Sequence, residues 1–179
     1  LAWALVFERA VLRRALFALA GLPFLYFAFS AQDSAWSPYY YVQHEQSAEG
    51  LRVYVNSSFH QLAIDWSDDS PEARGLQKMM LARFGVPYDV YRDMHDGSAP
   101  KKVLVLGAGT GNDVQVALLN QAEQVVAVEI DPVILSLGRE RNPARPYADP
   151  RVRAVVDDAR HFLRTSGERF DLIIFGTLD

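Results

Sequence analysis

Residues 103–112 read VLVLGAGTGN, and this stretch decides the fold. Four consecutive apolar residues (103–106) are expected of a β-strand that is buried on both faces of a sheet. The glycines that follow, Gly107, Gly109 and Gly111, permit a tight turn and let a ligand approach the backbone closely. The stretch therefore predicts a strand, a glycine loop and a helix of an α/β domain that binds a nucleoside.

Strands and helices continue to alternate along the rest of the chain. Apolar runs and helical patterns follow one another at residues 125–128, 132–141, 152–156, 159–164 and 172–175. Alternating β and α elements imply a parallel, doubly wound sheet of the Rossmann-like type. Because such a sheet rarely ends with its fourth strand as a bare edge, we expect it to be incomplete at the C-terminus, with further strands beyond Asp179.

The region before this sheet has a different pattern. Residues 37–69 read as short alternating strands separated by turns, which predicts a small antiparallel β-meander. A helix then starts at Ser70-Pro71-Glu72, where Ser70 can cap it and Pro71 suits the first helical position. We therefore divide the chain into three parts: an apolar helical segment (1–36), the meander (37–69) and a Rossmann-like domain with a leading helix (70–179).

The leading helix carries one apolar stripe. Leu76, Met79, Met80 and Phe84 recur at helical spacing, and Gly85 ends the pattern. We expect the two methionines to fill the core rather than to contact a cofactor.

The N-terminal 31 residues are strongly apolar. Ala15–Ala31 is 17 residues without a charge, which is the short limit for a membrane span. We interpret residues 1–31 as membrane-associated; the alternative is a buried or interfacial helix kinked at Pro23. Arginines before this stretch favour placing its start in the cytoplasm, whereas the nucleoside-binding domain is itself expected to be cytoplasmic, so the topology stays open.

Composition excludes several classes of partner. A net charge of −4 gives no sign of a nucleic-acid partner. The chain has no cysteine, and its four histidines show no metal-ligand spacing, so no metal site is expected.

Carboxylates follow two of the strand-like runs. Glu129 ends the second run, 18 residues beyond Gly111, where it can accept both ribose hydroxyls. Asp157 and Asp158 follow the third run, where a carboxylate can accept a hydrogen bond from an adenine amino group; Asp158 could instead cap the next helix. Together with glycine spacing that differs from the GxGxxG of dinucleotide sites, these residues favour an S-adenosylmethionine-type site over an NAD site.

From about Ser37 to Asp179 the chain resembles the spermidine synthase family, the polyamine aminopropyltransferases. The resemblance rests on the Ser37-Pro38-Tyr39 start, the meander up to Gln61, the segment 76–79 and the three nucleoside-site features. It implies a small β-domain before a Rossmann-like domain, and S-adenosylmethionine or its decarboxylated form as the ligand. It also implies a small-molecule amine as acceptor and leaves a homodimer open. The apolar N-terminal segment is similar to that of the membrane-attached branch of the family.

The resemblance implies roles for single residues. Glu129 matches the ribose-binding carboxylate, and Asp158 matches the adenine-contacting aspartate. Gln77 matches the Gln or His of the family's Tyr-[Gln/His]-Glu-Met motif, near cofactor and amine. Gln61 matches a glutamine on the substrate side.

Two departures from the family pattern concern the chemistry. Thr110, in the cofactor loop, stands where the family usually has an aspartate that helps to hold the cationic end of decarboxylated S-adenosylmethionine. The family's Asp-Ser-Ser-Asp motif reads Gly176-Thr177-Leu178-Asp179 here. The first aspartate of that motif is the proposed base for the attacking amine, so Asp179 is the remaining candidate catalytic carboxylate.

Three functions stay open from the sequence. The first is aminopropyl transfer, a probable transferase activity in which the usual catalytic aspartate is replaced by Gly176. The second is an S-adenosylmethionine-dependent methyltransferase on the same scaffold. The third is a non-catalytic, membrane-tethered module that binds a nucleoside or a polyamine.

Overall fold

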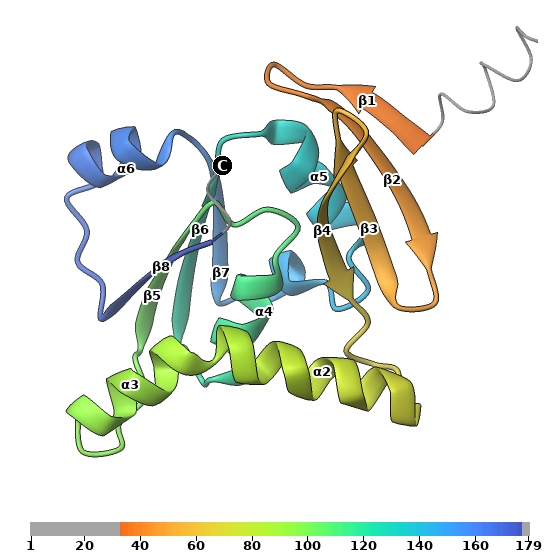
Figure 1. Ribbon diagram of the computed structural model, residues 1–179. Helices are drawn as coiled ribbons and strands as arrows, with labels where there is room; N and C mark the ends of the chain where they lie inside the picture. Colours follow the sequence, from red (N-terminus) through yellow and green to blue (C-terminus); the bar gives the residue numbers. More distant parts are fainter. Residues whose placement is uncertain (1–32, 177–179) are drawn as a thin grey trace, which may run out of the picture. The chain divides into compact units, whose positions relative to one another are not determined.

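The computed structural model describes residues 33–176 (Figure 1). The chain divides into two compact units, Leu1–Ala35 and Trp36–Asp179. The expected apolar segment falls almost entirely outside the described residues, and the short strand β1 (Ser34–Trp36) follows it. None of the helices between residues 33 and 176 is long and apolar enough to span a membrane.

A small antiparallel sheet opens the second unit. Its strands β2 (Tyr41–Ser47), β3 (Gly50–Val55) and β4 (Ser58–Ile64) pair consecutively, as the alternating pattern predicts. Their buried apolar side chains pack against Ile134 and Leu137 of helix α5 (Pro132–Arg141). The predicted meander is confirmed, and its apolar face packs against helix α5.

A parallel sheet forms the centre of the second unit. It consists of β5 (Lys102–Leu106), β6 (Gln124–Glu129), β7 (Val152–Val156) and β8 (Leu172–Phe175), in the order β7-β6-β5-β8. All three strand pairs are parallel. The α/β fold with a parallel sheet is therefore confirmed. All four strands point their carboxyl ends to the same edge, where open α/β sheets bind ligands.

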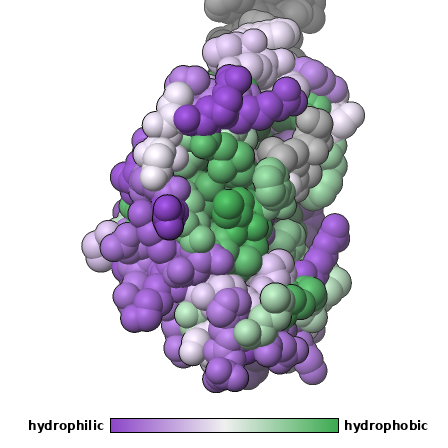
Figure 2. Space-filling model, turned by 90° about the vertical axis from the view of Figure 1, so that its left-hand side faces the viewer, coloured by the Kyte–Doolittle hydropathy of each residue, from purple (hydrophilic) through white to green (hydrophobic). Residues whose placement is uncertain are grey.

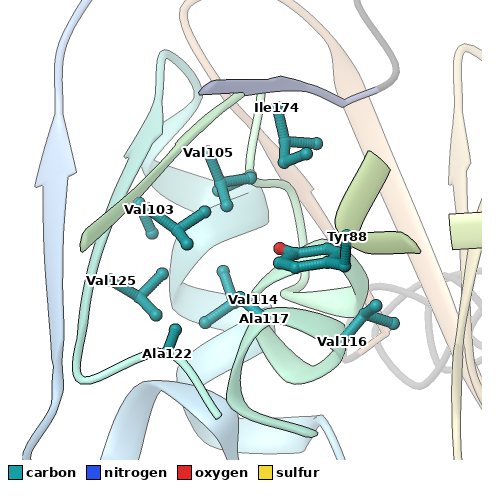
Figure 3. Packing of buried hydrophobic residues seen from close by; sticks show 11 residues of the cluster. Tyr88, Val103, Val105, Val114, Val116, Ala117, Ala122, Val125 and Ile174 are labelled. Atoms are coloured by element: carbon teal, nitrogen blue, oxygen red, sulfur yellow. The ribbon is translucent and has the colours of Figure 1, made fainter. Parts of the chain in front are cut away.

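Helices cover both faces of this sheet, as the continuous apolar strands require. On one face, Val103 and Val105 pack with helices α3 (Val86–Met94) and α4 (Asn112–Leu119). Figure 3 shows the ring of Tyr88, from α3, among these side chains. On the other face, Leu104 and Leu106 pack against helix α6 (Ala159–Thr165). The helix α3 was not predicted from the sequence.

The leading helix α2 (Pro71–Phe84) begins as predicted but packs differently. The Ser70 hydroxyl accepts a hydrogen bond from the Ala73 N–H (3.2 Å), so the predicted cap is confirmed. The prediction that both methionines fill the core is wrong, because no residue of α2 is buried and Met79 is 57% exposed. Only the C-terminal end of α2 reaches the core, where Phe84 packs against it.

The edge strands of the parallel sheet are less buried than the central ones. In β7 no residue is fully buried, in agreement with its less uniformly apolar sequence. At the other edge, Ile173 and Phe175 of β8 are exposed. Figure 2 shows apolar side chains gathered on the face of the molecule where β8 and α6 lie in Figure 1. The expected continuation of this sheet lies outside the described residues and stays a prediction.

Candidate functional site

A cavity of about 380 Å³ lies at the carboxyl ends of the parallel strands. Its size falls within the range of small-molecule sites. It is lined from five directions: the meander, the end of α2, the glycine loop with the start of α4, the segments after β6 and β7, and β8. The lining residues are Tyr39, Tyr40, His60, Gln61, Phe84, Gly107, Ala108, Gly109, Asn112, Asp113, Val128, Glu129, Ile130, Ile134, Asp157, Asp158, Ala159, Arg160, Leu163 and Phe175.

The glycine loop forms the floor of this cavity. The N–H groups of Gly107 and Ala108 both donate to the Val128 carbonyl oxygen, at 2.9 and 3.0 Å, which ties the loop to β6. Gly109 has a φ of +55°, and a Cβ there would lie 2.6 Å from Gln61 Oε1. The positive φ at position 109 therefore favours glycine, and a larger residue would also have to displace the Gln61 side chain.

Glu129 lies at the end of β6 and is 7% exposed. Its two carboxylate oxygens accept the N–H groups of Gly109 (2.7 Å) and Asp131 (2.9 Å). A carboxylate offers about four lone-pair sites, so acceptor capacity remains for two further donors. The pair of backbone bonds holds the carboxylate in place, and its remaining capacity suits a pair of ribose hydroxyls.

Asp157 and Asp158 line the same cavity from the end of β7. The Asp158 side chain caps α6 by accepting the His161 N–H at 2.9 Å, so the capping interpretation describes what this carboxylate does in the fold. The Asp157 carboxylate lies 2.8 Å from His161 Nδ1 and accepts the Asp158 N–H. Both side chains are thus oriented by the first turn of α6 while they line the cavity.

Gln61 joins the meander to the glycine loop. Its Oε1 accepts both the N–H (2.9 Å) and the hydroxyl (2.7 Å) of Thr110, and the Asn112 amide donates to the Leu62 carbonyl oxygen (2.8 Å). Gln61 lines the cavity as well. These bonds place the small sheet directly against the loop that forms the cavity floor.

Other predicted site residues lie elsewhere. Thr110 is fully buried and does not line the cavity, and neither does Gly111. Gln77 also lies outside the cavity, because its amide donates to the backbone oxygens of Asp65 and Asp68 (3.0 Å each). Asp179 lies outside the described residues. The structure therefore groups Gln61, the first two loop glycines and the three strand-end carboxylates.

Two residues near the glycine loop were missed by the sequence analysis. Tyr147, in the short 3₁₀ helix η2 (Pro146–Ala148), donates its hydroxyl hydrogen to the Gly109 carbonyl oxygen (2.7 Å). Burial raises the pKa of this phenol, so it stays a donor. Asp113, on α4, lines the cavity, and burial raises the pKa of its carboxyl to about 6. An acidic residue directly after the glycine loop, inside an apolar helix, was the signal for Asp113.

Comparison with known families gives one domain match. Residues 84–179, more than half of the chain, match the model of the spermine/spermidine synthase domain. Among curated proteins, polyamine aminopropyltransferase 1 of Pseudomonas aeruginosa is 35% identical over 85 residues, covering 45% of this chain and 30% of that protein. The polyamine aminopropyltransferase of Thermococcus onnurineus is 34% identical over 83 residues, covering 45% of this chain and 29% of that protein. The chain thus spans about 30% of the length of these relatives.

Solved structures agree with the fold. The spermidine synthase from Thermotoga maritima superposes with a TM-score of 0.62 at 19% identity, over 82% of this chain and 46% of that chain. A spermidine synthase in complex with the transition-state analogue AdoDATO gives a TM-score of 0.60 at 18% identity, over 79% and 46%. At this identity the likeness concerns the fold alone. It covers the meander together with the parallel sheet.

Proposed function

Because this chain belongs to the spermine/spermidine synthase family, we propose that it binds decarboxylated S-adenosylmethionine and transfers its aminopropyl group to a small-molecule amine. The observation that carries the proposal is one cavity that joins the glycine loop, Glu129 and the Asp157-Asp158 pair. In this proposal Glu129 accepts hydrogen bonds from the ribose hydroxyls, and Asp158 accepts one from the adenine amino group. Gln61 and the loop glycines shape the wall against which the ligand lies.

The order of the strands supports this arrangement. Asp158 lies in the segment after β7, Glu129 is the last residue of β6, and the glycine loop follows β5. Neighbouring strands lie about 4.8 Å apart, so a nucleoside that runs along the sheet edge meets these groups in turn. Its reactive end then points toward the ends of β5 and β8.

The sulfonium of the bound ligand would supply an activated carbon and a good leaving group for attack by an amine. The protein has to hold that amine next to the carbon. A primary alkylamine has a pKa of about 10.4, as lysine does, so it arrives almost entirely as an ammonium ion at neutral pH. The acceptor side of the site therefore requires an anionic group.

We also propose that position 176 contributes no base to this reaction, since the family's aspartate is replaced by Gly176. A Cβ at this position would collide with the Gly107 carbonyl oxygen, which supports a requirement for glycine in this chain. Asp179 stays the candidate carboxylate of that segment.

The test is product analysis with the full-length protein. We expect methylthioadenosine and an aminopropylated product when decarboxylated S-adenosylmethionine is supplied with a panel of linear diamines and polyamines. Glu129→Gln is the variant that should impair binding of the nucleoside and thereby lower product formation. Methyl transfer from intact S-adenosylmethionine would instead support the methyltransferase alternative. Ligand binding without any turnover would support the non-catalytic module.

We further propose that residues 1–31 attach the protein to a membrane, with the nucleoside-binding domain on the cytoplasmic side. The uncharged stretch Ala15–Ala31 supports this proposal. Fractionation of cells that express the protein tests it. Recovery of the full-length protein in the supernatant after high-speed centrifugation would contradict it.

A further inference from the structure

Asp113 differs from the other carboxylates of the cavity. Its side chain is partly buried in the first turn of α4 and lines the cavity. Glu129, Asp157 and Asp158 all accept hydrogen bonds from neighbouring N–H groups. Asp113 makes no hydrogen bond or ion pair with any residue between 33 and 176. None of the described residues therefore uses the acceptor capacity of this carboxylate.

The position of Asp113 along the sheet edge is equally distinct. A Cβ placed on Gly176 would lie 3.3 Å from Asp113 Oδ2, so this carboxylate lies beside the end of β8. Asp158 lies after β7 and Glu129 ends β6, toward the other end of the strand order β7-β6-β5-β8. The cavity thus has a carboxylate at the end opposite to the predicted adenine position.

The surroundings of Asp113 favour a cationic ligand. Among the described residues, the groups that interact with it electrostatically are two phenols, Tyr88 of α3 and Tyr147 of η2, and neither carries a positive charge. An ionised carboxylate that is partly removed from water and has no partner gains strongly from a cation. The backbone of Gly176, directly after β8, lies beside the carboxylate, which also lines the cavity.

We propose that Asp113 binds a primary alkylammonium group in this cavity. The inference rests on the proposed function, which brings two such groups to the site: the acceptor amine and the free end of the aminopropyl arm. Both offer three N–H donors and one positive charge, which matches a carboxylate. Asp113 thereby sets the specificity of the site for cationic over neutral ligands.

Calorimetry with the full-length protein tests this inference without relying on turnover. The parent protein, Asp113→Asn and the control Asp93→Asn are titrated with methylthioadenosine, with decarboxylated S-adenosylmethionine, and with a linear diamine in saturating methylthioadenosine. Asp93 is an exposed carboxylate of α3, so its variant loses the same charge away from the cavity. A hydrogen bond to a charged group predicts that Asp113→Asn weakens the affinity for a cationic ligand by about tenfold or more.

The ligands whose affinity falls in Asp113→Asn show which ammonium group this residue binds. Weaker binding of the diamine assigns Asp113 to the acceptor, and weaker binding of decarboxylated S-adenosylmethionine alone assigns it to the aminopropyl arm. Unchanged affinity for both cationic ligands overturns the inference, and so does an equal loss for methylthioadenosine. If the parent binds none of the three ligands, the proposed function itself fails and the inference fails with it.

A pH series supplies a second measurement. The parent should lose affinity for the cation as the pH falls through about 6, where Asp113 becomes protonated, and the asparagine variant should lack this step. His60 also lines the cavity and is titratable, but it is present in both proteins, so the difference between them isolates Asp113. Identical pH profiles would contradict the inference. Asp113→Glu, which keeps the charge, should restore the step.

Discussion

Replacing Asp113 with asparagine should stabilise the protein at neutral pH in the absence of ligand. Burial raises the pKa of this carboxyl from 3.8 to about 6 in the folded state. The folded protein therefore binds more protons than the unfolded chain within this window, and its stability decreases as the pH rises through it. Above about pH 6 the buried carboxyl is ionised, and the free energy of unfolding is lowered by the full amount. Below about pH 4 the carboxyl is protonated in both states, and this loss of stability is absent.

The size of the expected stabilisation follows from the shift in the pKa of Asp113. About two pKa units at about 1.4 kcal/mol each give a penalty of about 3 kcal/mol, which asparagine removes. Urea unfolding of parent and variant at about pH 4 and about pH 7.5 measures the free energy of unfolding under both conditions. We expect the variant to gain up to about 3 kcal/mol at the higher pH and little at the lower.

The comparison between the two pH values is the decisive one. A gain of equal size at both would show that asparagine acts through packing, and a loss at about pH 7.5 would show that the carboxylate is stabilising in the fold. Either result would refute the reasoning. Asp93→Asn, which removes an exposed charge, should leave the free energy of unfolding nearly unchanged at both pH values.

Three further changes test the cavity floor. Glu129→Gln replaces one acceptor oxygen with a donor, so methylthioadenosine should bind about tenfold weaker or worse in calorimetry; unchanged affinity would contradict the ribose role. Gly109→Ala should lower the free energy of unfolding in urea by about 1–2 kcal/mol because φ is +55°, and full stability would show that the loop adapts. Tyr147→Phe removes the donor to the Gly109 carbonyl oxygen and should cost about 1–3 kcal/mol in the same assay; a neutral result would mean that another donor replaces it.

The parallel sheet was predictable because its signals are local in the sequence. A strand buried on both faces must be apolar at every position, and Val103–Leu106 meets this condition without reference to any other segment. The predicted bounds of β7, β8 and α5 agree with the structure because turn residues or capping residues flank each of them. The meander was predictable for the same reason.

The packing of the helices was less predictable. The stripe on α2 has helical spacing, but spacing does not say whether another element covers that side of the helix, and Met79 is left exposed. The helix α3 starts directly after Gly85, and among its residues only Tyr88 is buried. A single buried residue in nine gives no periodic signal. Both differences depend on tertiary contacts that the sequence pattern does not encode.

Some residues of the candidate site were likewise predictable from the sequence, and others were not. Glu129, Asp157 and Asp158 could be grouped in advance, because each ends or follows a strand of one parallel sheet and all such ends meet at one edge. Gln77 could not be located, since its amide is engaged by the backbone oxygens of Asp65 and Asp68. No sequence pattern shows which of several acceptors a surface amide selects.

For Asp113, part of its placement follows from the sequence and part only from the structure. Its sequence position, directly after the glycine loop, places it at the cavity floor. Only the structure shows that its carboxylate lines the cavity beside Gly176 and has no hydrogen-bond partner among residues 33–176. An unpaired, partly buried carboxylate lowers stability, and a bound ammonium group would remove that cost. Stability without ligand and affinity for a cation should therefore change in opposite directions in Asp113→Asn. A purely structural role for this carboxylate would not produce that combination.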